Sequence, residues 1–387
     1  LNASSEGDVY AQLQRNKLEL IQCSQIKETP GLGVLSNVIK KSVTTRDLIQ
    51  FFIQLEQMQN AGIGLLEALN DAKSSADNAT LRDIVTEIHK DVSEGASLSG
   101  SMKRYPDTFS PLYISLISAG EETGDLVSAY TKLISYLKWV DEMSTKVKKA
   151  TKYPMILLFV IIITVGIMMG VVVPQIVGFI ANLDQELPFY TVWLVNTSEF
   201  FQSSWYMLVI VPMVLFIALK LLKAFSKEFC YQLDKIILEA PVFGPIIRKI
   251  NMARYAQTFG SLYASGIDVL KALSASRSTI GNLAIIGALE QVEESVLNGS
   301  SLSDSFAKSG EFPNLIIRML KIGEESGNLS GTMEQVSDFY TKDVDEAVEG
   351  LITLIEPALT LIMGVMLLWI AAGVFGPIYN SFGEIDF

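Results

Sequence analysis

Histidine and cysteine are scarce in this chain of 387 residues, which has one histidine and two cysteines. His89 stands in a polar helical segment, DIVTEIHKDV, where a solvated side chain is expected rather than a metal ligand or a catalytic base. Cys23 and Cys230 are far apart in dissimilar contexts, so we expect two thiols and no disulfide framework. The phosphate-cradling run G-x-x-x-x-G-K-[ST] is also missing. We therefore predict no cofactor and no enzymatic activity.

Positive charge is also in short supply. Lysine and arginine number 30 against 42 acids, giving a net charge of -12, which argues against a protein that binds nucleic acid through its phosphates. Only 19% of the residues are charged and 49% are hydrophobic, and the mean hydropathy is positive. This composition is too apolar for an ordinary cytosolic protein and too charged for a polytopic transporter, so it predicts soluble domains joined to a few membrane spans.

Three segments are long and apolar enough to cross a bilayer core of roughly 30 Å. They are residues 154–174, 205–222 and 351–376. The lysines of KVKKATK precede the first span, whereas residues 175–204 contain no lysine or arginine. By the positive-inside rule the N-terminus is cytoplasmic, residues 175–204 and the tail 377–387 lie on the outer side, and the second span returns the chain to the cytoplasm. The protein is then predicted to be a multi-pass membrane protein.

The two cytoplasmic parts, residues 44–150 and 223–350, are predicted to be bundles of five or six helices. One apolar stripe at helical spacing consists of Leu48, Phe51, Phe52, Leu55 and Met58. Thr44 with Asp47, and Thr80 with Asp83, have the spacing of a capping box at a helix start. Residues 1–23 are expected to form a small N-terminal segment, with a possible strand at 18–21, and residues 24–43 a linker.

An internal repeat organises the chain. SAGEETGDL at 118–126 matches KIGEESGNL at 321–329, AGIGLLEAL at 61–69 matches SGIDVLKAL, and EGASLSGS at 94–101 matches NGSSLSDS. The offset is 203 or 204 residues, and Pro154 and Pro174 recur as Pro357 and Pro377. The sequence thus predicts a helical bundle and its following span, duplicated in tandem. The overall fold class is an all-α membrane protein with two tandem cytoplasmic bundles and three transmembrane helices.

The ordered set of GEETGDL, KYP, ELPFYT, GEESGNL and IEP, together with RDLIQFFIQLEQMQNAGIGLLEAL, resembles the type II secretion F family, the inner-membrane platform proteins of type II secretion and type IV pilus machines. The resemblance runs from about Ala3 to Phe382. It implies a scaffold that couples a hexameric cytoplasmic assembly ATPase to extraction and polymerisation of pilin or pseudopilin subunits. It also implies a location in the bacterial inner membrane, which makes residues 175–204 a periplasmic loop and 377–387 a periplasmic tail. Other inner-membrane assembly proteins are implied as partners, and a homo-oligomer that is a dimer or a small ring. The alternative from another class is a transporter or channel subunit, since parallel repeats occur there.

Two interpretations of the repeated acidic motif are open. Glu121 and Asp125 could share a helix face and bind a hard cation, although such sites usually gather six or more oxygens. In the other interpretation Gly120 ends one helix, Thr123 or Ser326 caps the next, and nearby acids favour that helix start. The motif residues in question are Gly120, Glu121, Thr123, Gly124, Gly323, Glu324, Ser326 and Gly327.

Lys152 and Glu356 precede Pro154 and Pro357 at nearly equal positions of the two copies. Charges at a membrane edge either pair or reach the headgroups, so we hypothesise a contact between Lys152 and Glu356, within or between subunits, against simple snorkelling. The aromatic outer loop contains the motif residues Leu187, Pro188 and Thr191. It fits either a segment lying in the interface plane or an ordinary aromatic belt.

Overall fold

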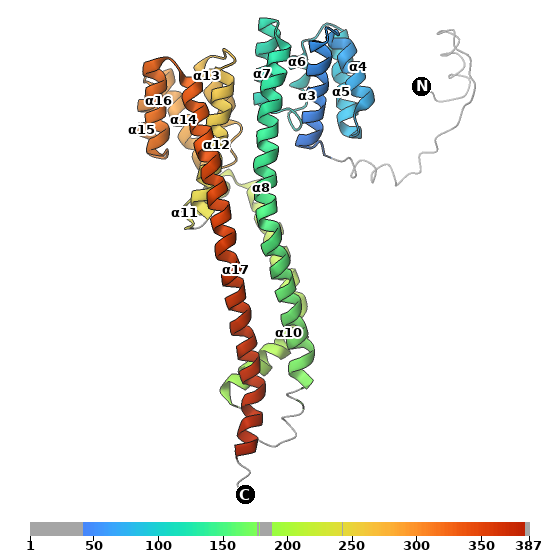
Figure 1. Ribbon diagram of the computed structural model, residues 1–387, viewed down its shortest axis with the longest axis vertical. Coiled ribbons are helices and arrows are strands. Elements are labelled where there is room, and N and C mark those ends of the chain that lie inside the picture. The colour runs from blue at the N-terminus through green and yellow to red at the C-terminus, as the bar shows by residue number, and fades with distance from the viewer. Residues whose placement is uncertain (1–41, 176–177, 179–187, 242, 384–387) are drawn as a thin grey trace, which may run out of the picture.

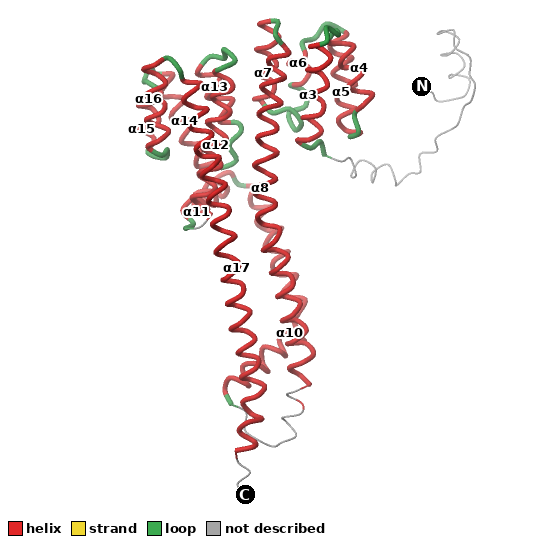
Figure 2. The backbone as a smooth tube through the Cα atoms, in the orientation of Figure 1, coloured by secondary structure: helices red, strands yellow, loops and turns green. Residues whose placement is uncertain are grey.

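The computed structural model describes residues 42–175, 178, 188–241 and 243–383. Within these residues every regular element is a helix and none is a strand (Figure 2). The expected N-terminal segment, its possible strand and nearly all of the linker lie outside the described residues. Two groups of shorter helices lie at one end of the molecule, and two long helices run from them to the other end (Figure 1).

Six described helices form the first repeat. They are α3 (Thr45–Asn60), α4 (Leu65–Ser75), α5 (Ala79–Ser93), α6 (Leu98–Met102), α7 (Pro111–Thr123) and α8 (Leu126–Ile167). Leu48, Phe51, Phe52 and Leu55 are buried on one face of α3, as the stripe predicted. The capping box of Thr44 and Asp47 is confirmed. The one expected at Thr80 is wrong, because Asn78 caps α5 by accepting hydrogen bonds from the amides of Thr80 and Leu81.

The second repeat follows α11 (Lys227–Glu239) and has the same order of helices. It consists of α12 (Phe243–Tyr263), α13 (Val269–Arg277), α14 (Leu283–Leu297), α15 (Leu302–Ser309), α16 (Asn314–Ser326) and α17 (Leu329–Gly383). The caps recur as well, since Asn282 caps α14 as Asn78 caps α5. The offset changes by one residue in the connection before α16, residues 310–313, which matches residues 106–110 of the first repeat. The tandem duplication predicted from the sequence is therefore visible helix by helix.

The apolar segments continue the last helix of each bundle without a break. In the described part of the chain, Leu126–Gln175 and Leu329–Gly376 are long and apolar enough to cross a membrane by length and composition. Pro154 lies inside α8 and Pro357 inside α17, so the expected boundaries at 150 and 350 mark a change of composition and not of secondary structure. α8 ends in a π-helical turn, η1 (Met168–Val172). Each bundle is thereby connected rigidly to its apolar segment.

The stretch expected to be an outer loop is partly helical. α10 (Phe189–Phe225) starts after Pro188 and bends at Ser204, where φ is -128° and ψ is 20°. Before the bend α10 crosses the far ends of the long helices, and after it α10 returns toward the bundles (Figure 1). The prediction of a loop over 175–204 is thus wrong from residue 189 onward, because α10 buries Thr191, Leu194 and Ser198 on one narrow face and leaves several of its aromatic residues exposed, a pattern that few charges and many aromatic residues do not distinguish from an interfacial loop.

Candidate functional site

The first acidic motif holds together two parts of its own bundle. The Glu121 carboxylate, at the end of α7, accepts hydrogen bonds from the backbone N–H of Leu98 at 2.5 Å and of Ser99 at 3.2 Å, and from the Ser99 hydroxyl. These are the free amides at the start of α6, where a negative charge is favoured. Glu121 therefore caps a helix 22 residues earlier in the chain.

The second motif repeats this arrangement. Glu324 of α16 accepts from the N–H of Leu302 at 2.5 Å and of Ser303 at 3.0 Å, and from the Ser303 hydroxyl at 2.6 Å. In each copy the serine stretch, ASLS or SSLS, thus donates hydrogen bonds to the glutamate of the acidic stretch, GEETG or GEESG. The two stretches are separate in the sequence but form one interaction. The serine partners were missed by sequence reasoning, although their similar separation from the glutamate, 22 residues in the first copy and 21 in the second, was a usable signal.

The turn after each glutamate differs from the expected one. Gly124 and Gly327, not Gly120 and Gly323, end the helices, with left-handed φ values of 74° and 69°. Gly120 lies inside α7, where a Cβ would be 2.7 Å from the Cβ of Ala129, so glycine permits the close approach of α8. In each copy, the residue after this glycine caps the start of the next helix, α8 or α17.

Asp125 caps α8 by accepting from the N–H of Ser128 at 3.0 Å, and Asn328 accepts from Gly331 at 3.1 Å. The expected caps Thr123 and Ser326 do not do so: the Thr123 hydroxyl donates back to the Ala119 carbonyl. The two side chains proposed for a cation, Glu121 and Asp125, are directed to different amides. Among the described residues no group of three or more His, Cys, Asp or Glu side chains is arranged to hold a metal ion.

Both turns are exposed and lie far from the apolar segments. In each copy the second glutamate and the three residues after it are exposed: Glu122, Thr123, Gly124 and Asp125 in the first, Glu325, Ser326, Gly327 and Asn328 in the second. Thirty residues of straight helix separate Gly124 from Pro154, which is about 45 Å at 1.5 Å per residue. We call these eight residues the corner surface. It is exposed to solvent and separated by this length of helix from the apolar part of α8.

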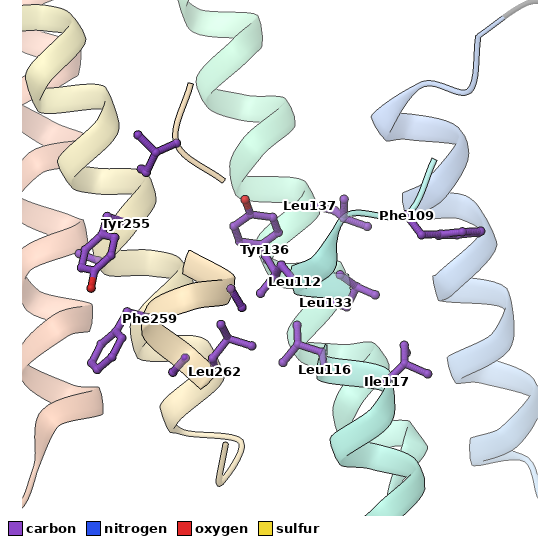
Figure 3. Close-up of a cluster of buried hydrophobic side chains, with 14 of the residues drawn as sticks. Phe109, Leu112, Leu116, Ile117, Leu133, Tyr136, Leu137, Tyr255, Phe259 and Leu262 are labelled. Carbon is purple, nitrogen blue, oxygen red and sulfur yellow. The ribbon is translucent and has the colours of Figure 1, made fainter. Parts of the chain in front are cut away.

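The two bundles are packed on one another through α7, α8 and α12. Leu112 and Leu116 of α7 and Tyr136 of α8 lie on the side of the first bundle that approaches Leu262 of α12 (Figure 3). The Lys132 ammonium donates to the Ala264 carbonyl and the Ser265 hydroxyl, both at 3.1 Å. The two copies thus share one continuous apolar core.

Tyrosines line this contact between the bundles. Burial raises the pKa of Tyr113 to about 12, helped by nearby Tyr136 and opposed by Ser110 and Arg254. Burial also raises the pKa of Tyr136. The Trp139 indole of α8 donates to the Thr341 hydroxyl of α17 at 3.2 Å, and Lys146 pairs with Asp345 at 2.7 Å. The long helices are therefore fixed in register before they enter their apolar parts.

The membrane-edge residues are arranged differently from the hypothesis. Glu356 accepts a hydrogen bond at 3.4 Å from the Tyr153 hydroxyl, the residue next to Lys152. In the described part of the chain Lys152 forms no ion pair with Glu356. The contact between them within one chain is thus not formed, because α8 turns Tyr153 and not Lys152 toward α17. A contact between subunits stays a hypothesis.

At the far end, the first part of α10 is bound to both long helices. Thr191, fully buried, donates to the Gly373 carbonyl of α17 at 2.9 Å, and Ser198 donates to the Met169 carbonyl in η1 at 2.6 Å. Leu194 packs between Met169, Val173, Ile370 and Val374. Of the predicted outer residues, Thr191 is in this contact, Pro188 begins the helix, and Leu187 lies outside the described residues.

Comparison with known proteins identifies relatives along nearly the whole chain. The profile of the family described as "Type II secretion system (T2SS), protein F" matches twice, over residues 51–174 and 255–377. Each match covers one bundle and its apolar segment, and the two end at the equivalent prolines, Pro174 and Pro377. The duplicated unit seen in the structure is therefore the unit of the family.

Curated relatives come from both kinds of machine. The chain is 33% identical to "Type IV pilus assembly protein PilC" of Pseudomonas aeruginosa over 340 residues, covering 88% of this chain and 91% of the relative. It is 28% identical to "Type IV pilus assembly protein TapC" of Aeromonas hydrophila, covering 98% and 91%. It is 29% identical to "Type II secretion system protein F" of Xanthomonas campestris, covering 98% and 94%.

Proposed function

The chain belongs to the type II secretion system protein F family, and we propose that it is the inner-membrane platform of a type IV pilus or type II secretion machine. The observation that carries this function is the similarity to pilus assembly and secretion proteins over nearly the full length of both partners in the comparison. In this role the platform couples a hexameric cytoplasmic ATPase to extraction of pilin-like subunits from the bilayer.

The membrane arrangement proposed for this role has three spans. The apolar parts of α8 and α17 would cross from the cytoplasm outward, and the second part of α10 would return the chain between them. The lysines before the first span and their absence from residues 175–204 support a cytoplasmic N-terminus. Parallel α8 and α17, both running from bundle to apolar end, agree with the same direction of crossing (Figure 1).

The corner surface is the proposed docking site for the ATPase. It is exposed in both copies, and it is separated from Pro154 by about 45 Å of helix. A soluble motor that binds there can move the bundles without reaching the membrane. α8 and α17 are continuous, and the contacts Trp139–Thr341 and Lys146–Asp345 join them. A movement of the bundles would therefore shift both helices together and displace their apolar ends.

The alternative function is a subunit of a transporter or channel. A pathway for solutes needs polar groups along the whole depth of the membrane. In the described apolar parts of α8 and α17 the one charged side chain is Glu356, which lies near the end closer to the bundles. The platform is therefore favoured. Solute flux into proteoliposomes that contain the purified protein, above that of empty liposomes, would favour the transporter.

Deletion of the gene tests the platform role. The deletion strain is scored for surface pili by electron microscopy and for released exoproteins, and then complemented with the full chain. We expect loss of one of the two, restored by complementation, with pilin or pseudopilin subunits accumulating in the inner membrane. A deletion strain with normal pili and normal secretion would refute the proposed function.

A further inference from the structure

The apolar part of α17 carries an open groove with a single charge at one end. The groove has a volume of about 720 Å³. Glu356 lies at its end nearer the bundles, followed by Pro357, Thr360, Leu361, Gly364, Val365 and Leu368. No described residue fills the space above Gly364, since a Cβ there would have no atom within 4 Å. The groove is therefore shaped to accept side chains from outside this chain.

α8 carries a matching ridge at the same depth. Ile156, Phe159 and Ile163 follow Lys152 at separations of four, three and four residues, which places the four on one helix face. The three apolar side chains are 53%, 62% and 44% exposed. The hydrogen bond from Tyr153 to Glu356 fixes the relative height of the two helices, so Lys152 and Glu356 lie at one level.

Both charges lack a counter-charge in the part of the chain that the structure describes. Among the described residues neither Lys152 nor Glu356 takes part in an ion pair, and both are exposed. An unpaired charge at the edge of the bilayer core is costly, and an opposite charge at the same depth reduces that cost. Because α8 and α17 run in the same direction, a second copy in the same membrane presents its own Lys152 at the level of Glu356.

We propose that the groove of α17 receives the ridge of α8 from a second copy of this chain, with Lys152 of one copy paired to Glu356 of the other. The contact joins two different surfaces, so it either closes reciprocally in a dimer or repeats around a small ring. The proposal deepens the homo-oligomer of the proposed function. It depends on the proposed membrane arrangement but not on the role in filament assembly.

Charge reversal in pairs tests the contact. Two differently tagged copies are co-expressed, and the fraction of one that co-purifies with the other from membranes is measured. Lys152→Glu in both copies, or Glu356→Lys in both, brings like charges together, and we expect co-purification to fall by about tenfold or more. Glu349→Lys, two turns nearer the bundles on the same face of α17 and outside the groove, is the matched control and leaves association unchanged.

Mixing the two single variants separates a contact between copies from one within a copy. When a Lys152→Glu copy is co-expressed with a Glu356→Lys copy, each inter-copy contact of a dimer or an even-numbered ring again joins opposite charges, so association is restored. A pair within one chain would not be restored by mixing, and that result would overturn the proposal. Single variants that associate like the wild type would also overturn it.

Filling the groove provides a test that leaves the charges intact. Gly364→Phe occupies open space and is expected to preserve the fold, as judged by circular dichroism, while it abolishes co-purification. If Gly364→Phe stops filament assembly but leaves co-purification intact, the groove holds another membrane helix, and the proposal of a second copy is refuted. Co-purification itself does not require filaments, so a failure of the contact is distinguishable from a failure of the platform function.

Discussion

The Glu121 carboxylate and the backbone amide of Leu98 are hydrogen-bonded at 2.5 Å, and Glu324 and Leu302 are bonded at the same distance in the second copy. The glutamate in the last turn of α7 or α16 thus holds the start of the short helix α6 or α15. Glu121 and Glu324, which stand out in the sequence by their negative charge, therefore stabilise the fold of their own bundles. They fix the shape of the corner surface that we propose as a docking site.

Loss of the Glu121 carboxylate is expected to destabilise the first bundle. Glu121→Ala leaves two amides and the Ser99 hydroxyl without their acceptor, and we expect a cost of about 2 kcal/mol in the free energy of unfolding. Glu121→Gln keeps one acceptor oxygen and should cost about half as much. Denaturant unfolding of the full chain in detergent measures both. Glu122→Gln, an exposed neighbour, is the control, and equal losses at 121 and 122 would contradict the capping role.

The two kinds of glycine in the motif should respond differently to alanine. Gly124→Ala forces a side chain into a left-handed turn with φ of 74°, at a cost of about 1 kcal/mol. Gly120→Ala meets the Ala129 side chain and separates α7 from α8, so its cost should be larger. Gly350→Ala, in an open helical position of α17, should be neutral or stabilising. Thermal unfolding of the three variants gives the order, and a destabilised Gly350→Ala would contradict it.

High pH is expected to weaken the contact between the bundles. The pKa of Tyr113 is raised from 10.0 to about 12, so the folded protein favours the neutral phenol. The contribution of Tyr113 to stability is complete below pH 10 and is lost as pH rises toward 12. Unfolding measured from pH 9 upward should show a decline that is less steep in Tyr113→Phe. An identical pH dependence in the two proteins would contradict this assignment.

The hydroxyl of Ser198 should hold the far ends of the long helices together. It donates to the Met169 carbonyl in η1, so Ser198→Ala leaves a buried carbonyl without a donor, at about 1 to 2 kcal/mol. We expect faster hydrogen exchange in η1 and the start of α10. The control is Thr197→Val, because the Thr197 hydroxyl donates to the Trp193 carbonyl of its own helix. Equal exchange in both variants would show that Ser198 does not hold η1.

The sequence predicts correctly those features that follow from local periodicity or from the internal repeat. The α3 stripe, the Thr44 cap and the duplicated order of helices follow from spacing within a few residues or from one constant offset. The partner of Glu121 does not, because Ser99 is brought to it by a fold that spans 22 residues. The cap at Asp125 was assigned to Thr123 because both side chains can cap, and only the backbone position of Gly124 distinguishes them.

The composition of the first part of α10 did not determine its secondary structure. Pro188, the aromatic residues and the lack of positive charge are equally compatible with a loop and with a helix start. What decides is the packing of Thr191, Leu194 and Ser198 against two helices far away in the sequence. Likewise, the depth of Lys152 and Glu356 was evident from the repeat, but which neighbour faces α17 depends on the rotation of α8.

The most direct test of the central claim, that the corner surface receives the cytoplasmic motor, is binding of the assembly ATPase from the same cell to the full chain in lipid nanodiscs. The wild type is compared with Glu122→Lys/Glu325→Lys, which changes exposed corner residues, and with Glu349→Lys as a control. We predict that the wild type and the control bind, and that the corner variant binds at least about tenfold more weakly. Equal binding by all three, or no binding by the wild type, would contradict the claim.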